Sequence, residues 1–208
     1  MEQNRAERLL EWGAASFTLP GQTECGDLST VREFPGGAIA AVADGLGHGN
    51  EAATAARVAV RTIEAHAEES VISILRIAHE ALRSTRGVVL SMASFNGKEN
   101  TMSWLGVGNV EGVLLRHDPK SVPNQEVVLL RGGVVGYQLP EPYASVVQVS
   151  AGDTLILTTD GIRSDFGEYR KIQRESPQRI AERVCSERTK GNDDGLVLVV
   201  RYLGTHHE

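Results

Sequence analysis

An apolar run that ends in an aspartate and a glycine-rich turn constrains this chain more than any other feature. Residues 38–43 read Ala-Ile-Ala-Ala-Val-Ala, Asp44 follows, and Gly45, Gly47 and Gly49 come directly after it. A strand without polar side chains is stable only when both of its faces are buried. Glycines after such a strand let the backbone approach a ligand that side chains would obstruct. The segment therefore predicts a central strand that delivers a carboxylate to a functional site.

Acidic residues adjoin three other predicted strands or turns. They are Asp160 after the apolar run 154–159, Asp193 and Asp194 before the run 196–200, and Asp27 after Gly26. Each of them alone is most simply a turn residue, because Asp-Gly pairs and loop acids are common in turns. If they converge, however, their charges repel one another unless a cation lies between them. Oxygen ligands favour magnesium, manganese or calcium, and the sequence has no Cys/His cluster for zinc.

The pattern of apolar residues predicts more strands than helices. Alternation or short apolar runs between Gly, Pro and Asn predict strands over 12–19, 37–43, 88–95, 101–107, 110–116, 127–131, 144–149, 154–159 and 196–202. Helical spacing predicts helices over 50–68, 70–82 and 177–188, the last beginning with a proline. Helices and strands are segregated rather than alternating. This order predicts an α+β fold, a four-layer α/β/β/α sandwich of two antiparallel sheets flanked by helices.

Length and charge favour one cytoplasmic domain. The chain has 208 residues, 41% of them hydrophobic, and no internal repeat or linker, so we expect a single domain over 1–208 with its core over about 12–202. The net charge of −6 comes without a basic block, which argues against nucleic acid as a partner. No apolar run approaches the roughly 20 residues that cross a bilayer, and residues 1–10 do not resemble a signal peptide. We therefore expect no membrane contact.

The cysteines and tryptophans are assigned to structure rather than to chemistry. Cys25 and Cys185 are the only cysteines. We expect both to be reduced, buried thiols, because the cytosol keeps thiols reduced and no activating motif surrounds either one. Trp12 and Trp104 fall within predicted strands and are expected in the core.

Taken in order, the acidic motifs resemble those of the metal-dependent protein phosphatases of the PPM, or type 2C, family. The resemblance rests on Gly26-Asp27, on Val-Ala-Asp-Gly-Leu-Gly at 42–47, on Thr-Thr-Asp-Gly at 158–161 and on Asn-Asp-Asp at 192–194. It extends over about residues 16–202. Within the family the chain looks most like the small bacterial phosphatases that act on the stressosome, which are bare catalytic domains.

The resemblance implies a centre of two divalent cations, Mn²⁺ or Mg²⁺. It makes Asp44 the carboxylate that bridges both ions, with the carbonyl of Gly45 beside it. Asp27 would then complete one ion, and Asp160 and Asp193 the other. Asp44 and Asp160 become the catalytic residues, through a water that the ions activate.

The sequence also departs from the family pattern. Leu46 stands where many members have a histidine suited to protonating the leaving group. His48, two residues further on, is a candidate general acid, with a metal-bound water or no acid at all as the alternatives. Asn109 and Ser164 stand where larger relatives supply carboxylates, so a third ion is expected to be weak or absent.

These features predict a phosphatase for phosphoserine or phosphothreonine on proteins. The resemblance suggests phosphorylated STAS-domain proteins of a stressosome as substrates, whose dephosphorylation resets a bacterial stress-signalling complex. One alternative is a pseudophosphatase that binds the signalling complex without turnover, although the intact aspartates argue against it. Another is a phosphatase for small metabolites. Arg86 and Arg163 are candidates for contacting phosphate or a partner, although solvated surface arginines are the simpler interpretation.

Overall fold

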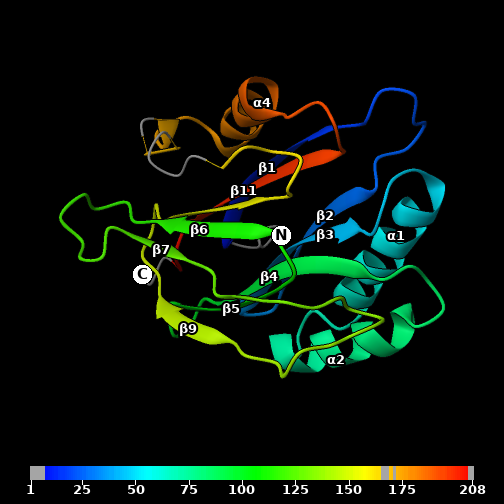
Figure 1. The fold of residues 1–208 in the computed structure, drawn as a ribbon. Coiled ribbons are helices and arrows are strands. Elements are labelled where there is room, and N and C mark those ends of the chain that lie inside the picture. The colour runs from blue at the N-terminus through cyan, green and yellow to red at the C-terminus, as the bar shows by residue number, and fades with distance from the viewer. Residues whose placement is uncertain (1–7, 165–168, 171, 206–208) are drawn as a thin grey trace, which may run out of the picture.

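Two β-sheets pack face to face, and helices cover both outer faces, in the computed structural model of this chain (Figure 1). The structure describes residues 8–164, 169–170 and 172–205. Helix α4 lies on one side of the pair of sheets, and helices α1 and α2 lie on the other. The expected four-layer α/β/β/α sandwich is therefore confirmed.

The first sheet has five strands in the order β1-β11-β10-β6-β7, all paired antiparallel. They span β1 Leu10–Phe17, β6 Glu111–Leu115, β7 Gln125–Val127, β10 Thr154–Thr158 and β11 Gly195–Tyr202. Helix α4, Pro177–Arg188, contacts β1 and β11. It begins with a proline in its first turn, as the sequence predicts.

The second sheet has the order β2-β3-β4-β5-β8, and β9 also pairs with β5. Its strands span β2 Asp27–Phe34, β3 Gly37–Gly45, β4 Val88–Asn96, β5 Thr101–Val107, β8 Leu130–Arg131 and β9 Ser145–Gln148. Helices α1, Asn50–Ala65, and α2, Val71–Leu82, cover its outer face. The short parallel pairing of β8 with β5 is an exception to the expected antiparallel sheets.

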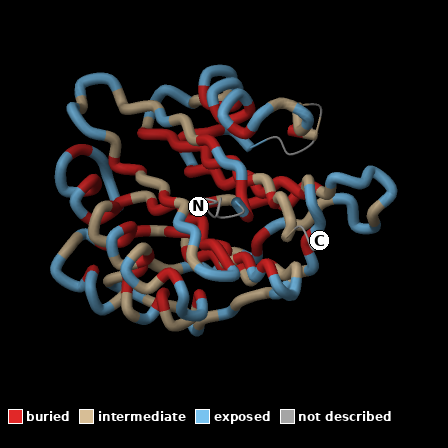
Figure 2. The backbone as a smooth tube through the Cα atoms, turned by 180° about the vertical axis from the view of Figure 1, so that it is seen from behind, coloured by how far each residue is buried: buried red, intermediate tan, exposed pale blue. Residues whose placement is uncertain are grey.

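Strand β3 shows why an uninterrupted apolar run was needed. Its side chains alternate between the core that separates the two sheets, which includes Ala38, Ala40 and Val42, and the core beneath α1 and α2, which includes Ile39, Ala41 and Ala43. A third core lies between the first sheet and α4. Figure 2 shows these buried stretches running through the middle of the molecule, with exposed chain concentrated in the loops. Both faces of β3 are thus buried, as predicted.

Two structural predictions were wrong, and one strand was missed. Strand β2 was not predicted, because it is an edge strand paired only with β3 and its exposed positions carry polar side chains. The strand predicted over 127–131 is instead two short strands, β7 and β8, in different sheets. Trp12 is 53% exposed on the edge strand β1, whereas Trp104 is buried as expected.

In the part of the chain that the structure describes, Cys25 and Cys185 are free thiols. Cys185 is buried, as expected, whereas Cys25 is only half-buried. Burial raises the pKa of both thiols, to about 12 for Cys25, so neither carries the depressed pKa of a reactive cysteine. None of the described helices has the length and apolar character needed to span a membrane.

Candidate metal centre

Asp27 and Asp44 lie opposite each other at one end of the β2–β3 hairpin. Asp27 begins β2, Asp44 is the penultimate residue of β3, and the antiparallel register pairs them directly. The Gly45 amide donates a hydrogen bond to the Gly26 carbonyl at 3.1 Å, which extends the pairing past the two acids. The hairpin register therefore places two carboxylates from distant sequence positions side by side.

Asp160 and Asp193 come from the other sheet. Asp160 lies two residues beyond β10 and Asp193 two residues before β11, and these strands pair antiparallel. The end of β10 and the start of β11 therefore meet at one edge of the sheet. The hydroxyl of Thr159, next to Asp160, donates a hydrogen bond to Asp27 at 2.7 Å, so this edge lies against the Asp27–Asp44 pair. We call Asp27, Asp44, Asp160 and Asp193 the four aspartates.

Two glycines beside the aspartates are required by close backbone packing. A Cβ atom on Gly45 would lie 2.1 Å from the Ala52 carbonyl oxygen in α1. A Cβ atom on Gly161 would lie 1.7 Å from the Asp194 carbonyl oxygen. Both distances are far below van der Waals contact, so any side chain would push the acidic segments apart. These glycines thus serve packing within the protein, in addition to the ligand access that the sequence suggested.

Electrostatics at the four aspartates favour a bound cation. Burial, followed by repulsion from the other three of the four aspartates, raises the pKa of Asp44 from its ordinary value of 3.8 to about 9. Burial also raises the pKa of Asp27 to about 7, although a hydrogen bond from Thr159 opposes the shift. Among the described residues, no Lys or Arg forms an ion pair with any of the four aspartates. A divalent cation would supply the missing positive charge.

Three of the four aspartates have one carboxylate oxygen held by a donor of the protein. Asp27 Oδ2 accepts from Thr159 Oγ1 at 2.7 Å, and Asp160 Oδ2 accepts from Asn109 Nδ2 at 2.8 Å. Asp193 Oδ1 accepts from the amide that follows it at 2.9 Å. The side chains of Asp27 and Asp44 also hydrogen-bond to each other, which lowers the pKa of Asp27 and raises that of Asp44. Carboxylates that bind metals are typically oriented in this way by a donor on the second oxygen.

Asp194 differs from its neighbour Asp193. It is 3% exposed, and its two oxygens accept from the amides of Leu19 at 2.8 Å and Gly26 at 2.7 Å. Both oxygens are thus occupied within the protein, which makes Asp193 the ligand candidate of this acidic pair. The sequence pointed to Asp194 as part of an acidic pair but not to its separate role, and Thr159 was missed. A hydroxyl at the end of an apolar strand and a second acid before a buried strand were the available signals.

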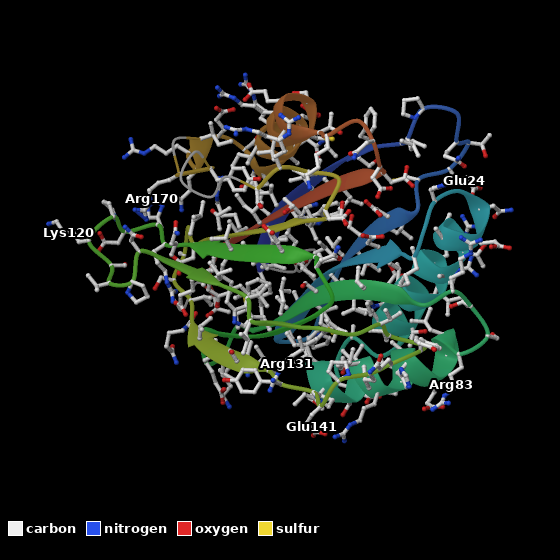
Figure 3. All side chains as sticks on the ribbon, in the orientation of Figure 1. Glu24, Arg83, Lys120, Arg131, Glu141 and Arg170 are labelled. Atoms are coloured by element: carbon white, nitrogen blue, oxygen red, sulfur yellow. The ribbon has the colours of Figure 1, made fainter. Side chains whose placement is uncertain are left out.

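The remaining candidate residues lie around the aspartates. His48 is exposed and, among the described residues, hydrogen-bonds to none of the four aspartates. Arg86 forms an ion pair with Glu51, and its guanidinium lies 2.8 Å from where a Cβ of Gly47 would be. Arg163 is exposed, and the structure gives its side chain no role. Figure 3 shows Glu24, on the loop before β2, at the opposite end of the molecule from Lys120 and Arg170.

The donor set fits a hard divalent cation. Within the described chain, no three Asp, Glu, His or Cys side chains are arranged to hold one ion by themselves. Two carboxylates, a backbone carbonyl and waters are the coordination typical of Mg²⁺, which keeps several waters when it binds to proteins. All candidate ligands are oxygens, which suits magnesium or manganese rather than zinc.

Comparison with known proteins identifies the family. The model of the family described as Stage II sporulation protein E (SpoIIE) matches residues 35–203. Phosphoserine phosphatase RsbX of Bacillus subtilis (strain 168) is 28% identical over 176 residues, which cover 84% of this chain and 85% of RsbX.

Solved structures agree with this match. One of them comes from a study of the bacterial stressosome, described as a modular system that has been adapted to control secondary messenger signaling. It matches with a TM-score of 0.85 and 26% identity, and the match covers 93% of this chain and 100% of the solved chain. RsbX in complex with magnesium has a TM-score of 0.81 and 22% identity, with coverage of 93% and 95%. The chain therefore belongs to the SpoIIE family, and it is a protein phosphatase with the type 2C fold.

Proposed function

We propose that the chain removes phosphate from phosphoserine or phosphothreonine of partner proteins at a centre of two divalent cations. The ligands would be the carboxylates of the four aspartates together with the Gly45 carbonyl. The observation that carries this proposal is that carboxylates from two sheets meet at one place and are oriented there by donors of the protein. Buried acids of this kind are destabilising unless they serve a bound cation.

Asp44 is the best candidate for the ligand that bridges the two ions. Its charge interacts with Asp27 from its own sheet and with Asp160 and Asp193 from the other sheet. Asp44 lies opposite Asp27 in the β2–β3 register, and its carboxylate would be shared by both ions. Asp27 would complete the ion on the side of the second sheet, and Asp160 and Asp193 the ion on the side of the first.

Two such ions, when bound, activate a water as the nucleophile and neutralise charge on the phosphoryl group. The protein's own residues hold the carboxylates in place through the donors Thr159 and Asn109. His48 stays a candidate general acid, because an exposed imidazole on the loop after Asp44 can reach a leaving group in a substrate complex. The side-chain amide of Asn109 donates a hydrogen bond to Asp160. Because this amide is used within the protein, the contact supports a centre without a strong third ion.

The proposed substrates are phosphorylated STAS-domain proteins of a stressosome, in the cytoplasm. The similarity to RsbX and to a chain studied with the bacterial stressosome supports this choice. The loop beside Asp44 supports a protein substrate, because Leu46, Gly47 and His48 are all exposed. An open rim of this kind admits a folded phosphoprotein more readily than it encloses a small metabolite.

The test is Mn²⁺-dependent release of phosphate from a phosphoserine-containing STAS-domain protein. The unaltered chain should release phosphate, and Asp44→Asn should abolish release, whereas Asp118→Asn on an exposed loop should not. Binding of the phosphoprotein without release, with metal bound, would replace the proposal by a pseudophosphatase. Rapid hydrolysis of small phosphomonoesters with none from the phosphoprotein would favour a metabolite phosphatase.

A further inference from the structure

The two halves of the proposed centre are carried by different sheets. Asp27 and Asp44 belong to the sheet covered by α1 and α2, whereas Asp160 and Asp193 flank strands of the sheet covered by α4. The chain crosses from one sheet to the other through residues 108–110, between β5 and β6, but none of the four aspartates lies on this connection. Something at the site must therefore hold them in register if two ions are to fit between them.

Thr159 makes one such link. Its Oγ1 atom donates to Asp27 Oδ2 at 2.7 Å and accepts from the amide of Leu196 at 2.8 Å, and the residue is 1% exposed. Because the amide can only donate, the hydroxyl proton must point to the carboxylate. The hydroxyl therefore fixes the orientation of the Asp27 carboxylate through Oδ2.

Asp194 makes the second link. Its carboxylate accepts from the amides of Leu19 and Gly26, so it holds both ends of the segment that leads into Asp27. A Cβ atom on Gly26 would lie 3.1 Å from Asp194 Oδ2 and 3.0 Å from the Ala52 side chain, so this segment is packed closely between the two sheets. Hydrogen bonds from amides to a buried carboxylate are among the stronger ones in proteins. The start of β2 is thereby fastened to the start of β11.

We propose that Thr159 and Asp194 are positioning residues that hold Asp27 at a set distance from Asp160 and Asp193. They would not touch the ions. Their effect would be on the affinity for the ion that Asp27 completes, because that ion needs an Asp27 oxygen correctly aimed. Loss of a hydrogen-bond partner behind a metal ligand typically lowers metal affinity by about 10–100-fold. The inference rests on the proposed metal centre.

The test compares Thr159→Val with Thr159→Ser by titrating Mn²⁺ into the folded protein in a calorimeter. Valine keeps the shape and removes the hydroxyl, whereas serine keeps the hydroxyl. We expect Thr159→Val to lower the affinity for one of the two Mn²⁺ ions by about 10–100-fold and to leave the affinity for the other ion within a few-fold of its original value. Thr159→Ser should bind both ions as the unaltered protein does.

Thr154→Val is the matched control. Thr154 is the first residue of β10, whereas Thr159 comes directly after the last one. Thr154 is equally buried, and its hydroxyl donates to the Gly152 carbonyl at the far end of β10. This variant should lose stability without losing Mn²⁺ affinity. If Thr159→Val does not fold, Asp194→Asn provides the same test. The asparagine side chain has only one acceptor oxygen, whereas the backbone amides of Leu19 and Gly26 each need one.

Two results separate the inference from the proposed function. Folded Thr159→Val or Asp194→Asn that bound both ions with unchanged affinity would overturn the positioning role and leave the metal centre intact. An unaltered protein that bound no Mn²⁺ would overturn the proposed function itself. A merely structural role predicts lower thermal stability in Thr159→Val with no change in the metal affinity of the folded molecule.

Discussion

Replacing Asp44 by asparagine should make the metal-free protein more stable at neutral pH. In the folded protein the pKa of Asp44 is raised from 3.8 to about 9, so the carboxyl holds a proton that it would release on unfolding. The folded pKa lies above the unfolded one. The contribution of Asp44 to stability is therefore complete below about pH 4 and is lost as the pH rises toward about 9. Asparagine has no proton to lose and removes this dependence.

The size of the effect follows from one proton. Between about pH 5 and about pH 7 the folded carboxyl is protonated and the unfolded one ionised, so the free energy of unfolding falls by ~1.4 kcal/mol per pH unit through this group. Between about pH 5 and about pH 7 the free energy of unfolding of the unaltered protein should therefore fall by ~2.7 kcal/mol more than that of Asp44→Asn. For a chain of this size this difference corresponds to roughly 5–10 °C in Tm.

Urea unfolding followed by circular dichroism, in EDTA and at several pH values, measures this difference. Asp118→Asn is the control, because Asp118 lies on an exposed loop and should leave the pH dependence unchanged. Added Mn²⁺ should raise the stability of the unaltered protein at high pH, where Asp44 loses its proton most easily, and should raise that of Asp44→Asn far less. Parallel stability curves for Asp44→Asn and the unaltered protein would refute the reasoning.

One further substitution tests the packing at the site, and another tests a buried ion pair at the opposite end of β10. Gly161→Ala should prevent stable folding, because its Cβ would lie 1.7 Å from a backbone oxygen, whereas Gly132→Ala, which meets nothing within 4 Å, should leave Tm nearly unchanged in a thermal melt. Arg116→Met should cost ~3–5 kcal/mol in urea unfolding, because it leaves the buried Asp153 without its cation. Arg83→Met, which breaks an exposed pair, should cost less than ~1 kcal/mol; equal losses for the two arginines would contradict this account.

Local patterns in the sequence were enough for most of the fold. The unbroken apolar run of β3 required burial on both faces, and the structure buries it between a helical layer and the first sheet. Residues 154–159 and 196–202 likewise predicted β10 and β11 nearly to their ends. Such patterns succeed because the period of burial along a strand depends only on which faces are covered.

The burial of residues on edge strands and the pairing of short strands could not be predicted from local sequence patterns. Trp12 looks like a core residue in any local window, yet it lies on an edge strand where burial depends on what covers the edge. Residues 127–131 form one apolar run but pass from one sheet to the other. The partner of a strand is chosen by distant parts of the chain, which a local pattern does not contain.

The sequence by itself determined that acids follow or precede buried strands in a set order, and hence which carboxylates are candidates for binding metal. Only the tertiary structure decided how they meet. The register of β2 with β3 pairs Asp27 with Asp44, and the contact between sheets directs the Thr159 hydroxyl to Asp27. It also separates Asp194, whose two oxygens are used within the protein, from Asp193, which keeps one available. The direction of a carboxylate oxygen depends on neighbours more than a hundred residues away, so only the folded chain fixes it.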